Sequence, residues 1–187
     1  MATRIRRARA SDSEILTRLA HTAKRYWGYP EGLIRLWKAD LTLTPEFVGH
    51  NPVYCAVRGS RVVGFYALSG SRGAAELEHM WVRPTCIGSG VGTLLFTHLV
   101  RRLRAMGVPR LKIASDPNAE GFYRRMGAHR VGRVSSRPAG RYLPLLVLRL
   151  RRSSSANSPR PRAEPPRSSS QSAAAADRKS TRLNSSH

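Results

Sequence analysis

Three glycines at alternate positions, Gly88, Gly90 and Gly92, follow an apolar run and precede an amphipathic stretch. Glycine adopts backbone conformations that other residues avoid and lets the chain approach a ligand closely. The N–H groups of such a turn can point inward, and a helix that begins there directs its positive dipole end to the same place. The pattern predicts a strand, a phosphate-binding turn and a helix in succession. The alternative is a turn that only joins the strand to the helix.

Two common nucleotide-binding motifs do not fit this turn. A phosphate-binding loop of the nucleotide hydrolases ends in Gly-Lys-Ser/Thr, whereas this loop continues with Val91, Gly92 and Thr93. A dinucleotide fingerprint would need a glycine at position 93 and an acidic residue about 20 residues further on, where residues 110–112 read Arg-Leu-Lys. Both classes are therefore excluded for this loop.

Residues 87–92 resemble the acetyl-CoA loop of the GNAT superfamily of N-acetyltransferases. The superfamily pattern is Gln or Arg, two free positions, Gly, one free position, then Gly or Ala. Only Ile87, at the first position, departs from it. The departure concerns one side-chain contact to the pyrophosphate and leaves the backbone donors unaffected.

A second motif lies downstream, where Pro117 suits the first turn of a helix and Gly127 its C-terminal cap. It resembles the superfamily's other signature, in which an Asn opens a helix beside the cofactor and a Tyr faces the thioester sulfur. Asn118 and Tyr123 are the matching positions. The two signatures occur in the expected order, and the resemblance covers roughly residues 3–150.

Hydrophobic periodicity predicts strands at 4–8, 52–57, 62–69, 75–82, 110–114, 129–134 and 142–150. Helices are expected from Ser11 or Asp12, over 31–40, briefly from Thr44, from the glycine loop to Gly107, and around Tyr123. The helix after the glycine loop is expected to bury Val91, Leu94, Leu95, Leu99, Leu103 and Met106. The resemblance implies an α/β (α+β) fold with a mixed, mostly antiparallel sheet of six to seven strands and about four flanking helices.

The resemblance also implies where acetyl-CoA, the co-substrate, is held. The strand before the glycine loop and the strand after the next helix are expected to splay apart, and the pantetheine arm enters that gap. No metal is expected. The predicted cofactor-binding residues are Met80, Trp81, Val82, Ile87, Gly88, Ser89, Gly90, Val91, Gly92, Thr93, Asn118 and Phe122.

Acetyl transfer to an amine needs a deprotonated nucleophile and a proton donor for the departing thiolate. Strand alternation places Glu76 and Glu78 on one face and Leu77 and His79 on the other. We expect Glu78 to act as a water-relayed base, with His79 as the competing candidate and a structural hydrogen bond as the alternative for each. Tyr123 is the expected general acid because a phenol stays protonated at neutral pH; aromatic packing is its alternative role.

Aromatic residues gather between the first two predicted helices, where Tyr26, Trp27 and Tyr29 are the predicted acceptor-binding residues. Alternatively, Trp27 and Trp37 cap the core beneath a loop. The predicted function is transfer of the acetyl group of acetyl-CoA to a small-molecule or peptide amine by direct attack in a ternary complex. The alternative function is an acyl-CoA-binding regulatory module with weak or no catalysis, which could be associated with nucleic acid.

Composition sets the remaining expectations. Lys and Arg number 33 against 11 Asp and Glu, a formal net charge of +22, but the arginines are scattered and follow no recognition motif, so no specific nucleic-acid partner is expected. Two cysteines, with no apolar stretch of about 18 residues, favour a cytoplasmic protein that does not enter a membrane. A monomer or a homodimer is expected.

The chain divides into three parts by composition. Residues 1–150 form the predicted acetyltransferase domain, and residues 151–176, rich in Ser, Pro, Arg and Ala, are expected to be a disordered tail. The last segment, 177–187, is the codon-by-codon reading of a common sequencing adapter. We hypothesise that it is an assembly artefact, which resequencing of genomic DNA would refute if the same codons were present.

Overall fold

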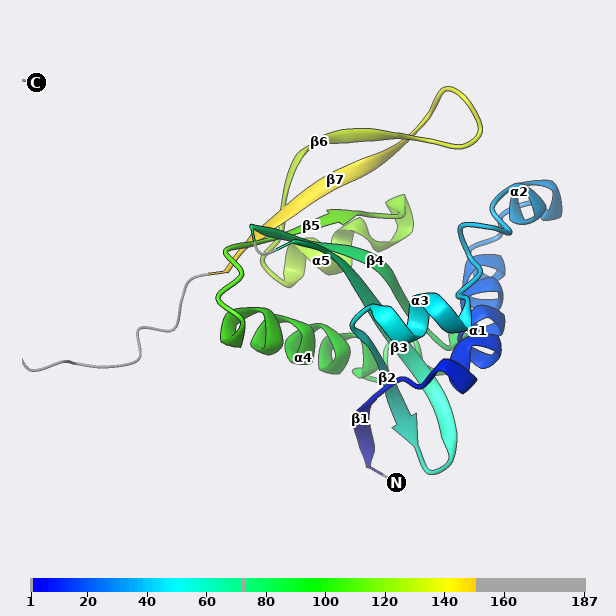
Figure 1. Cartoon of the computed structure of the whole chain (residues 1–187). Coiled ribbons are helices and arrows are strands. Elements are labelled where there is room, and N and C mark those ends of the chain that lie inside the picture. Colours follow the sequence, from blue (N-terminus) through cyan, green and yellow to red (C-terminus); the bar gives the residue numbers. More distant parts are fainter. Residues whose placement is uncertain (1, 72, 151–187) are drawn as a thin grey trace, which may run out of the picture. The chain divides into compact units, whose positions relative to one another are not determined.

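The computed structural model describes residues 2–71 and 73–150, so the predicted tail at 151–176 and the adapter-like segment at 177–187 lie outside the described residues. Seven strands and five α-helices make up this part of the chain (Figure 1). Their bounds are β1 Thr3–Arg7, α1 Ser13–Tyr26, α2 Glu31–Leu36, α3 Pro45–His50, β2 Val53–Arg58, β3 Arg61–Ser71, β4 Ala74–Val82, α4 Val91–Ala105, β5 Arg110–Ala114, α5 Glu120–Arg125, β6 His129–Ser136 and β7 Arg141–Arg149. Short 3-10 turns at Ala10–Asp12, Pro84–Cys86 and Pro117–Ala119 precede α1, the glycine loop and α5.

The seven strands form one sheet in the order β1-β2-β3-β4-β5-β7-β6. Every neighbouring pair is antiparallel except β4 and β5, which are parallel. The antiparallel meander β2-β3-β4 and the mixed sheet agree with the sequence-based prediction, and one more α-helix flanks the sheet than the four expected. Within the described residues no helix is long and apolar enough to cross a lipid bilayer.

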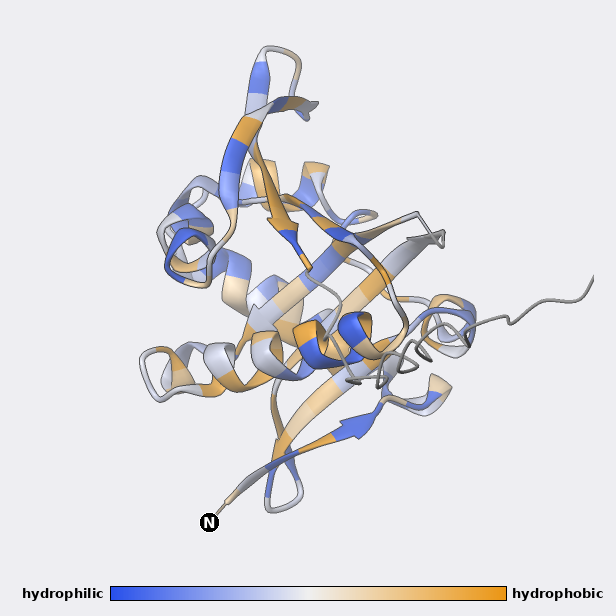
Figure 2. Cartoon of the chain, turned by 90° about the vertical axis from the view of Figure 1, so that its left-hand side faces the viewer, coloured by the Kyte–Doolittle hydropathy of each residue, from blue (hydrophilic) through white to orange (hydrophobic). Residues whose placement is uncertain are grey.

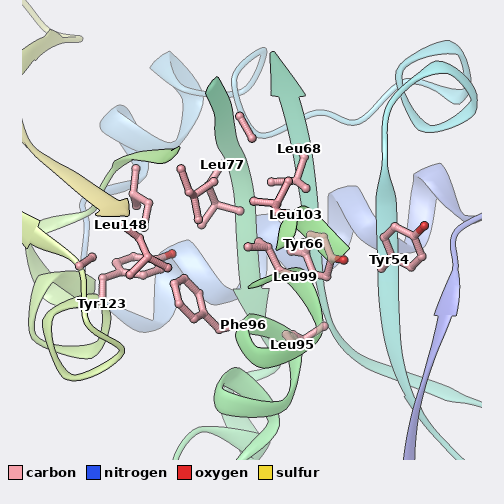
Figure 3. Packing of buried hydrophobic residues seen from close by; sticks show 14 of the residues in the cluster. Tyr54, Tyr66, Leu68, Leu77, Leu95, Phe96, Leu99, Leu103, Tyr123 and Leu148 are labelled. Carbon is pink, nitrogen blue, oxygen red and sulfur yellow. The ribbon is translucent and has the colours of Figure 1, made fainter. Parts of the chain in front are cut away.

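Two hydrophobic clusters cover opposite faces of the sheet. Helices α1, α2 and α3 bury Leu16, Ile34 and Val48 on one face, and α4 and α5 bury residues such as Leu99 and Tyr123 on the other (Figure 3). Figure 2 shows hydrophobic residues concentrated along the middle strands that separate the clusters. Buried apolar surface contributes about 25 cal/mol per Å², so these clusters supply the main stabilisation of the fold.

Helix α4 buries a somewhat different stripe from the one expected. Val91, Leu95, Leu99 and Leu103 are buried as predicted, but Leu94 is 38% exposed and Met106 is 62% exposed. Phe96 takes the place of Leu94 in the core, at 1% exposure. Met106 lies after the last helical residue, because Gly107 turns the chain with a φ of 68°. Helix α2 likewise ends at Leu36, short of the predicted residue 40.

Candidate active site

The glycine loop lies between the end of β4 and the beginning of α4. Gly88 and Gly90 have φ values of 80° and 83°, a left-handed conformation that costs an L-residue roughly 1–2 kcal/mol. A Cβ atom built on either glycine would meet no other atom within 4 Å. These two glycines are therefore required by backbone conformation, and the space beside them is free for a ligand.

Five consecutive or near-consecutive amides of this loop are free to bind an anion. The first hydrogen bond of the helix runs from the Leu94 N–H to the Gly90 carbonyl, at 3.0 Å. Among residues 2–71 and 73–150, no acceptor is found for the N–H groups that precede it in the loop and first turn, those of Gly88, Gly90, Val91, Gly92 and Thr93. Five free donors at or beside the positive end of a 15-residue helix suit a pyrophosphate.

A cleft of about 710 Å³ connects this loop to the opposite side of the sheet. It follows the edge of β4 beyond Leu77, which is unpaired because the parallel pairing with β5 ends at Leu77 and Ile113, as the expected splay requires. The predicted residues that line it are Trp27, Glu78, His79, Met80, Trp81, Val82, Ile87, Gly88, Gly90, Gly92, Thr93, Asn118, Phe122 and Tyr123. Tyr26, Tyr29, Ser89 and Val91 do not line it.

The four predicted residues outside the lining have other contacts. The Ser89 N–H and hydroxyl both donate to the Cys86 carbonyl, and the Val91 side chain is buried in the core. Tyr26 is 55% exposed on the surface. The Tyr29 hydroxyl is hydrogen-bonded to Asp116, which itself lines the cleft.

A β-bulge in β4 changes which residues share a face. Ala67 pairs with His79 but Leu68 pairs with Leu77, so Glu78 is the extra residue. The predicted alternation is therefore wrong at this point: Leu77 packs in the core beneath α4, whereas His79 contacts the rings of Phe47 and Phe65 on the other face. A bulge re-aims the side chains that follow it, which here places His79 and Trp81 on the side of α1.

The two candidate bases have different surroundings. Glu78 is exposed at the bulge and its carboxylate accepts a hydrogen bond from the Ser69 hydroxyl. His79 Nδ1 accepts a hydrogen bond from the Trp81 indole N–H at 3.3 Å, and burial lowers the pKa of His79 to about 4. A neutral imidazole that already accepts at Nδ1 carries its proton on Nε2 and is a poor base there. These contacts favour Glu78.

Tyr123 lines the cleft from α5 and is 6% exposed. Its ring packs 5.9 Å from the Phe96 ring, in the cluster drawn in Figure 3. Burial raises the pKa of Tyr123 above its usual value, so the phenol is protonated at neutral pH. The hydroxyl makes no hydrogen bond to any other residue of the described chain, which leaves it free to donate into the cleft.

Sequence reasoning missed a charged network on the α1 side of the cleft. The Lys24 ammonium forms an ion pair with Asp116, although these side chains are only 9% and 11% exposed. Burial lowers the pKa of Lys24. Burial would raise the pKa of Asp116, but hydrogen bonds from Lys24, the Asn118 N–H and Tyr29 outweigh it and lower that pKa. The hydrogen bonds thus favour the charged form of Asp116 beside the Lys24 ammonium.

Aromatic rings surround this ion pair. Lys24 Nζ lies 4.5 Å from the Tyr29 ring centre and 4.6 Å from that of Trp37. Trp37 is 4% exposed and caps the core as the alternative prediction had it, whereas Trp27 is 38% exposed. Only the aromatic cluster signalled this site in the sequence, because the partner of Lys24 lies 92 residues away.

Comparison with known proteins places the chain in a family. Residues 15–128 match the model of the Acetyltransferase (GNAT) family, which is more than half of the chain. The chain belongs to the GNAT acetyltransferase family. The peptidyl-lysine N-acetyltransferase YjaB of Salmonella typhimurium is 28% identical over 150 residues, covering 79% of this chain and 98% of that protein.

Solved structures show the same GNAT fold. The PaiA N-acetyltransferase of Thermoplasma acidophilum, in complex with coenzyme A, superposes with a TM-score of 0.69 at 18% identity, over 80% of this chain and 99% of that one. The apo form of YjaB from Escherichia coli has a TM-score of 0.61 at 24% identity, over 80% of this chain and 98% of that one.

The family resemblance, the fold and the N-acetyltransferase activity with acetyl-CoA predicted from the sequence are therefore confirmed. Within residues 2–71 and 73–150, no three His, Cys, Asp or Glu side chains gather as metal ligands. The independence of the reaction from metal remains a prediction, as do the roles of the individual site residues.

Proposed function

We propose that this GNAT protein transfers the acetyl group of acetyl-CoA directly to an amine bound on the α1 side of the cleft, with the lysine side chain of a peptide or a small-molecule amine as acceptor. The observation that carries the proposal is one cleft whose lining includes both Tyr123 and four residues with free amides, Gly88, Gly90, Gly92 and Thr93. YjaB, named as a peptidyl-lysine N-acetyltransferase, supports lysine as the first acceptor to test.

Acetyl-CoA supplies an activated carbonyl carbon and a thiolate leaving group. The glycine-loop amides hold its diphosphate. The backbone already fixes the direction of these N–H dipoles, so they do not have to reorient when the coenzyme binds. Residues 78–82 of β4, which β5 does not pair, offer main-chain groups to the pantetheine amides. Asn118 lines the same gap from the 3-10 turn that precedes α5.

Proton movements are assigned to two side chains. Glu78 takes up, through a water molecule, the proton that the acceptor ammonium must lose before its nitrogen can attack, because Glu78 is exposed at the bulge and lines the cleft. Tyr123 donates a hydrogen bond to the departing sulfur. Since its pKa lies above that of a thiol, near 8.5, the phenol stabilises the thiolate mainly by hydrogen bonding, with the proton remaining largely on the tyrosine. The C–N bond forms and the C–S bond breaks, and the second proton of the attacking nitrogen passes to the thiolate, so that coenzyme A leaves as the thiol.

A thiol-release screen tests this function. The full chain is incubated with acetyl-CoA and a panel of amines, namely lysine-containing peptides, amino acids, diamines and aminoglycosides, and free thiol is followed over time. Amine-dependent release, with acetylated product confirmed by mass spectrometry, is the expected result. Tight coenzyme A binding by calorimetry with no turnover on any acceptor would instead support the acyl-CoA-binding module.

A further inference from the structure

Arg141, the first residue of β7, carries a buried donor that the catalytic assignment does not use. Its Nη1 donates to the Ser136 hydroxyl at 2.9 Å. Its Nη2 is buried, and no acceptor for it is found within residues 2–71 and 73–150. Both Arg141 and Ser136 line the cleft. A buried donor without a partner costs roughly 1–3 kcal/mol, and more when it is charged.

Aromatic contacts fix the position of this guanidinium. Arg141 Cζ lies 4.6 Å from the Trp37 ring centre and 5.8 Å from that of Tyr29. Trp37 is itself held, because its indole N–H donates to the Arg137 carbonyl at 2.8 Å and ties α2 to the β6–β7 hairpin. In Figure 1 the tip of this hairpin extends toward α2. The arginine is therefore presented from a rigid wall of the cleft.

Charge at this wall is not balanced. Lys24 is close enough to Arg141 for the arginine to lower the pKa of the lysine further. The carboxylate beside them, Asp116, is already engaged by Lys24, the Tyr29 hydroxyl and Asn118. Arg141 forms no ion pair with any described residue. Two cations and one carboxylate thus lie in a partly desolvated site, and only Lys24 is paired with that carboxylate.

The other acids of the lining are placed differently. Asp40 and Glu78 are exposed, so water solvates both carboxylates. Exposed carboxylates suit an incoming ammonium, whereas a guanidinium edge with a free N–H suits a carboxylate. The cleft therefore offers complementary groups to a molecule that carries both charges.

We propose that Arg141 binds a carboxylate of the acceptor, so that the preferred substrates are amines bearing a carboxylate close to the reacting nitrogen. This inference rests on the proposed transferase function and deepens it. The carboxylate can belong to a free amino acid or to an acidic side chain beside a lysine in a peptide. The shared chemistry is an amine with an anionic group, and the experiment separates the two sources.

The test compares acceptors that differ only in the carboxylate. Lysine is paired with cadaverine, which lacks the carboxylate, and a Lys-Glu peptide with its Lys-Gln counterpart. A hydrogen-bonded charge pair predicts a kcat/KM about 10- to 100-fold higher for the carboxylated member of at least one pair. The pair that shows the preference identifies the source of the anion.

Variants then assign the preference to Arg141. R141Q is expected to reduce the ratio to about one while the affinity for coenzyme A stays unchanged, and R141K to retain part of the preference. The matched control is R133Q, because Arg133 lies on the same hairpin, also stacks on a ring, at 4.3 Å from the Tyr142 centre, and is outside the cleft lining.

Two results would overturn the inference. The first is a kcat/KM ratio near one for both acceptor pairs in the wild-type protein, and the second is a kcat/KM ratio in R141Q that is as high as in the wild type. Neither result touches the proposed function, which fails only if no amine of any charge stimulates thiol release.

Discussion

Replacing Gly90 with alanine isolates the contribution of loop backbone conformation to coenzyme binding. A methyl group at this position meets no other atom within 4 Å, so the substitution introduces no clash within the protein. Its cost comes from the φ of 83°, a left-handed conformation that is unfavourable for an L-residue by roughly 1–2 kcal/mol. The loop can respond in one of two ways, and each has its own readout.

If the loop keeps its shape, the folded state loses that free energy and the melting temperature of a domain this size falls by roughly 2–8 °C. If the loop relaxes, its amides turn away, stability is retained and the Kd for coenzyme A rises about 5- to 30-fold. Calorimetry and thermal unfolding of the same sample measure both. The free energy lost in the two measurements together should reach 1–2 kcal/mol.

Two other glycines serve as controls. Gly49 in α3 also has open space and an ordinary φ, so Gly49→Ala is expected to be neutral or slightly stabilising. Gly92→Ala places its Cβ 3.5 Å from Phe122 Cε2, an ordinary contact, and should also be accepted. A Gly90→Ala variant with unchanged Kd and unchanged melting temperature would refute the assignment of the strained turn.

Three further predictions concern buried side chains. Tyr123→Phe should lower turnover roughly 10- to 100-fold with little change in coenzyme A affinity, because a hydrogen bond to a developing thiolate is lost; an unchanged rate at saturating substrates removes Tyr123 from the reaction. The pKa of His79 is about 4 in the folded protein and 6.5 in the unfolded chain, so the unfolded state binds more protons between these pH values. The free energy of unfolding therefore falls as the pH drops from 6.5 to 4, by up to about 3 kcal/mol. Urea unfolding of His79→Gln at pH 4.5 and 7.5 should lack this component, and an identical pH dependence would contradict it. Lys24→Met leaves the Asp116 carboxylate buried without its cation and should lower the free energy of unfolding in urea by about 3–5 kcal/mol. Adding Asp116→Asn to this variant should restore most of that stability. A Lys24→Met protein as stable as the wild type would show that the pair is not coupled.

Local sequence signals predicted the elements that we propose to position the coenzyme. Positive φ at Gly88, Gly107 and Gly127 is a property that glycine alone supplies cheaply, so their positions marked the loop and two helix ends directly. Alternating apolar residues likewise identified the meander of β2, β3 and β4.

The acceptor side depends on contacts between distant residues, which one sequence does not reveal. The bulge at Glu78 has no composition signal, and it reversed the predicted face of His79 relative to Leu77. In the sequence Arg141 is one arginine among many. Only the fold shows that it lies on the ring of Trp37, which precedes it by 104 positions and is hydrogen-bonded to the same hairpin. Long-range pairing, and not residue type, selects these side chains.

Because the proposed diphosphate cradle consists of main-chain donors, point mutations other than those at Gly88 or Gly90 have little means of abolishing it. Inhibitors that imitate the coenzyme's phosphates would consequently be hard to escape by mutation but would discriminate poorly among enzymes built this way. Selective compounds for this enzyme should instead reach across the sheet toward Trp37 and Arg141, where the proposed recognition depends on side chains and resistance is correspondingly easier to evolve.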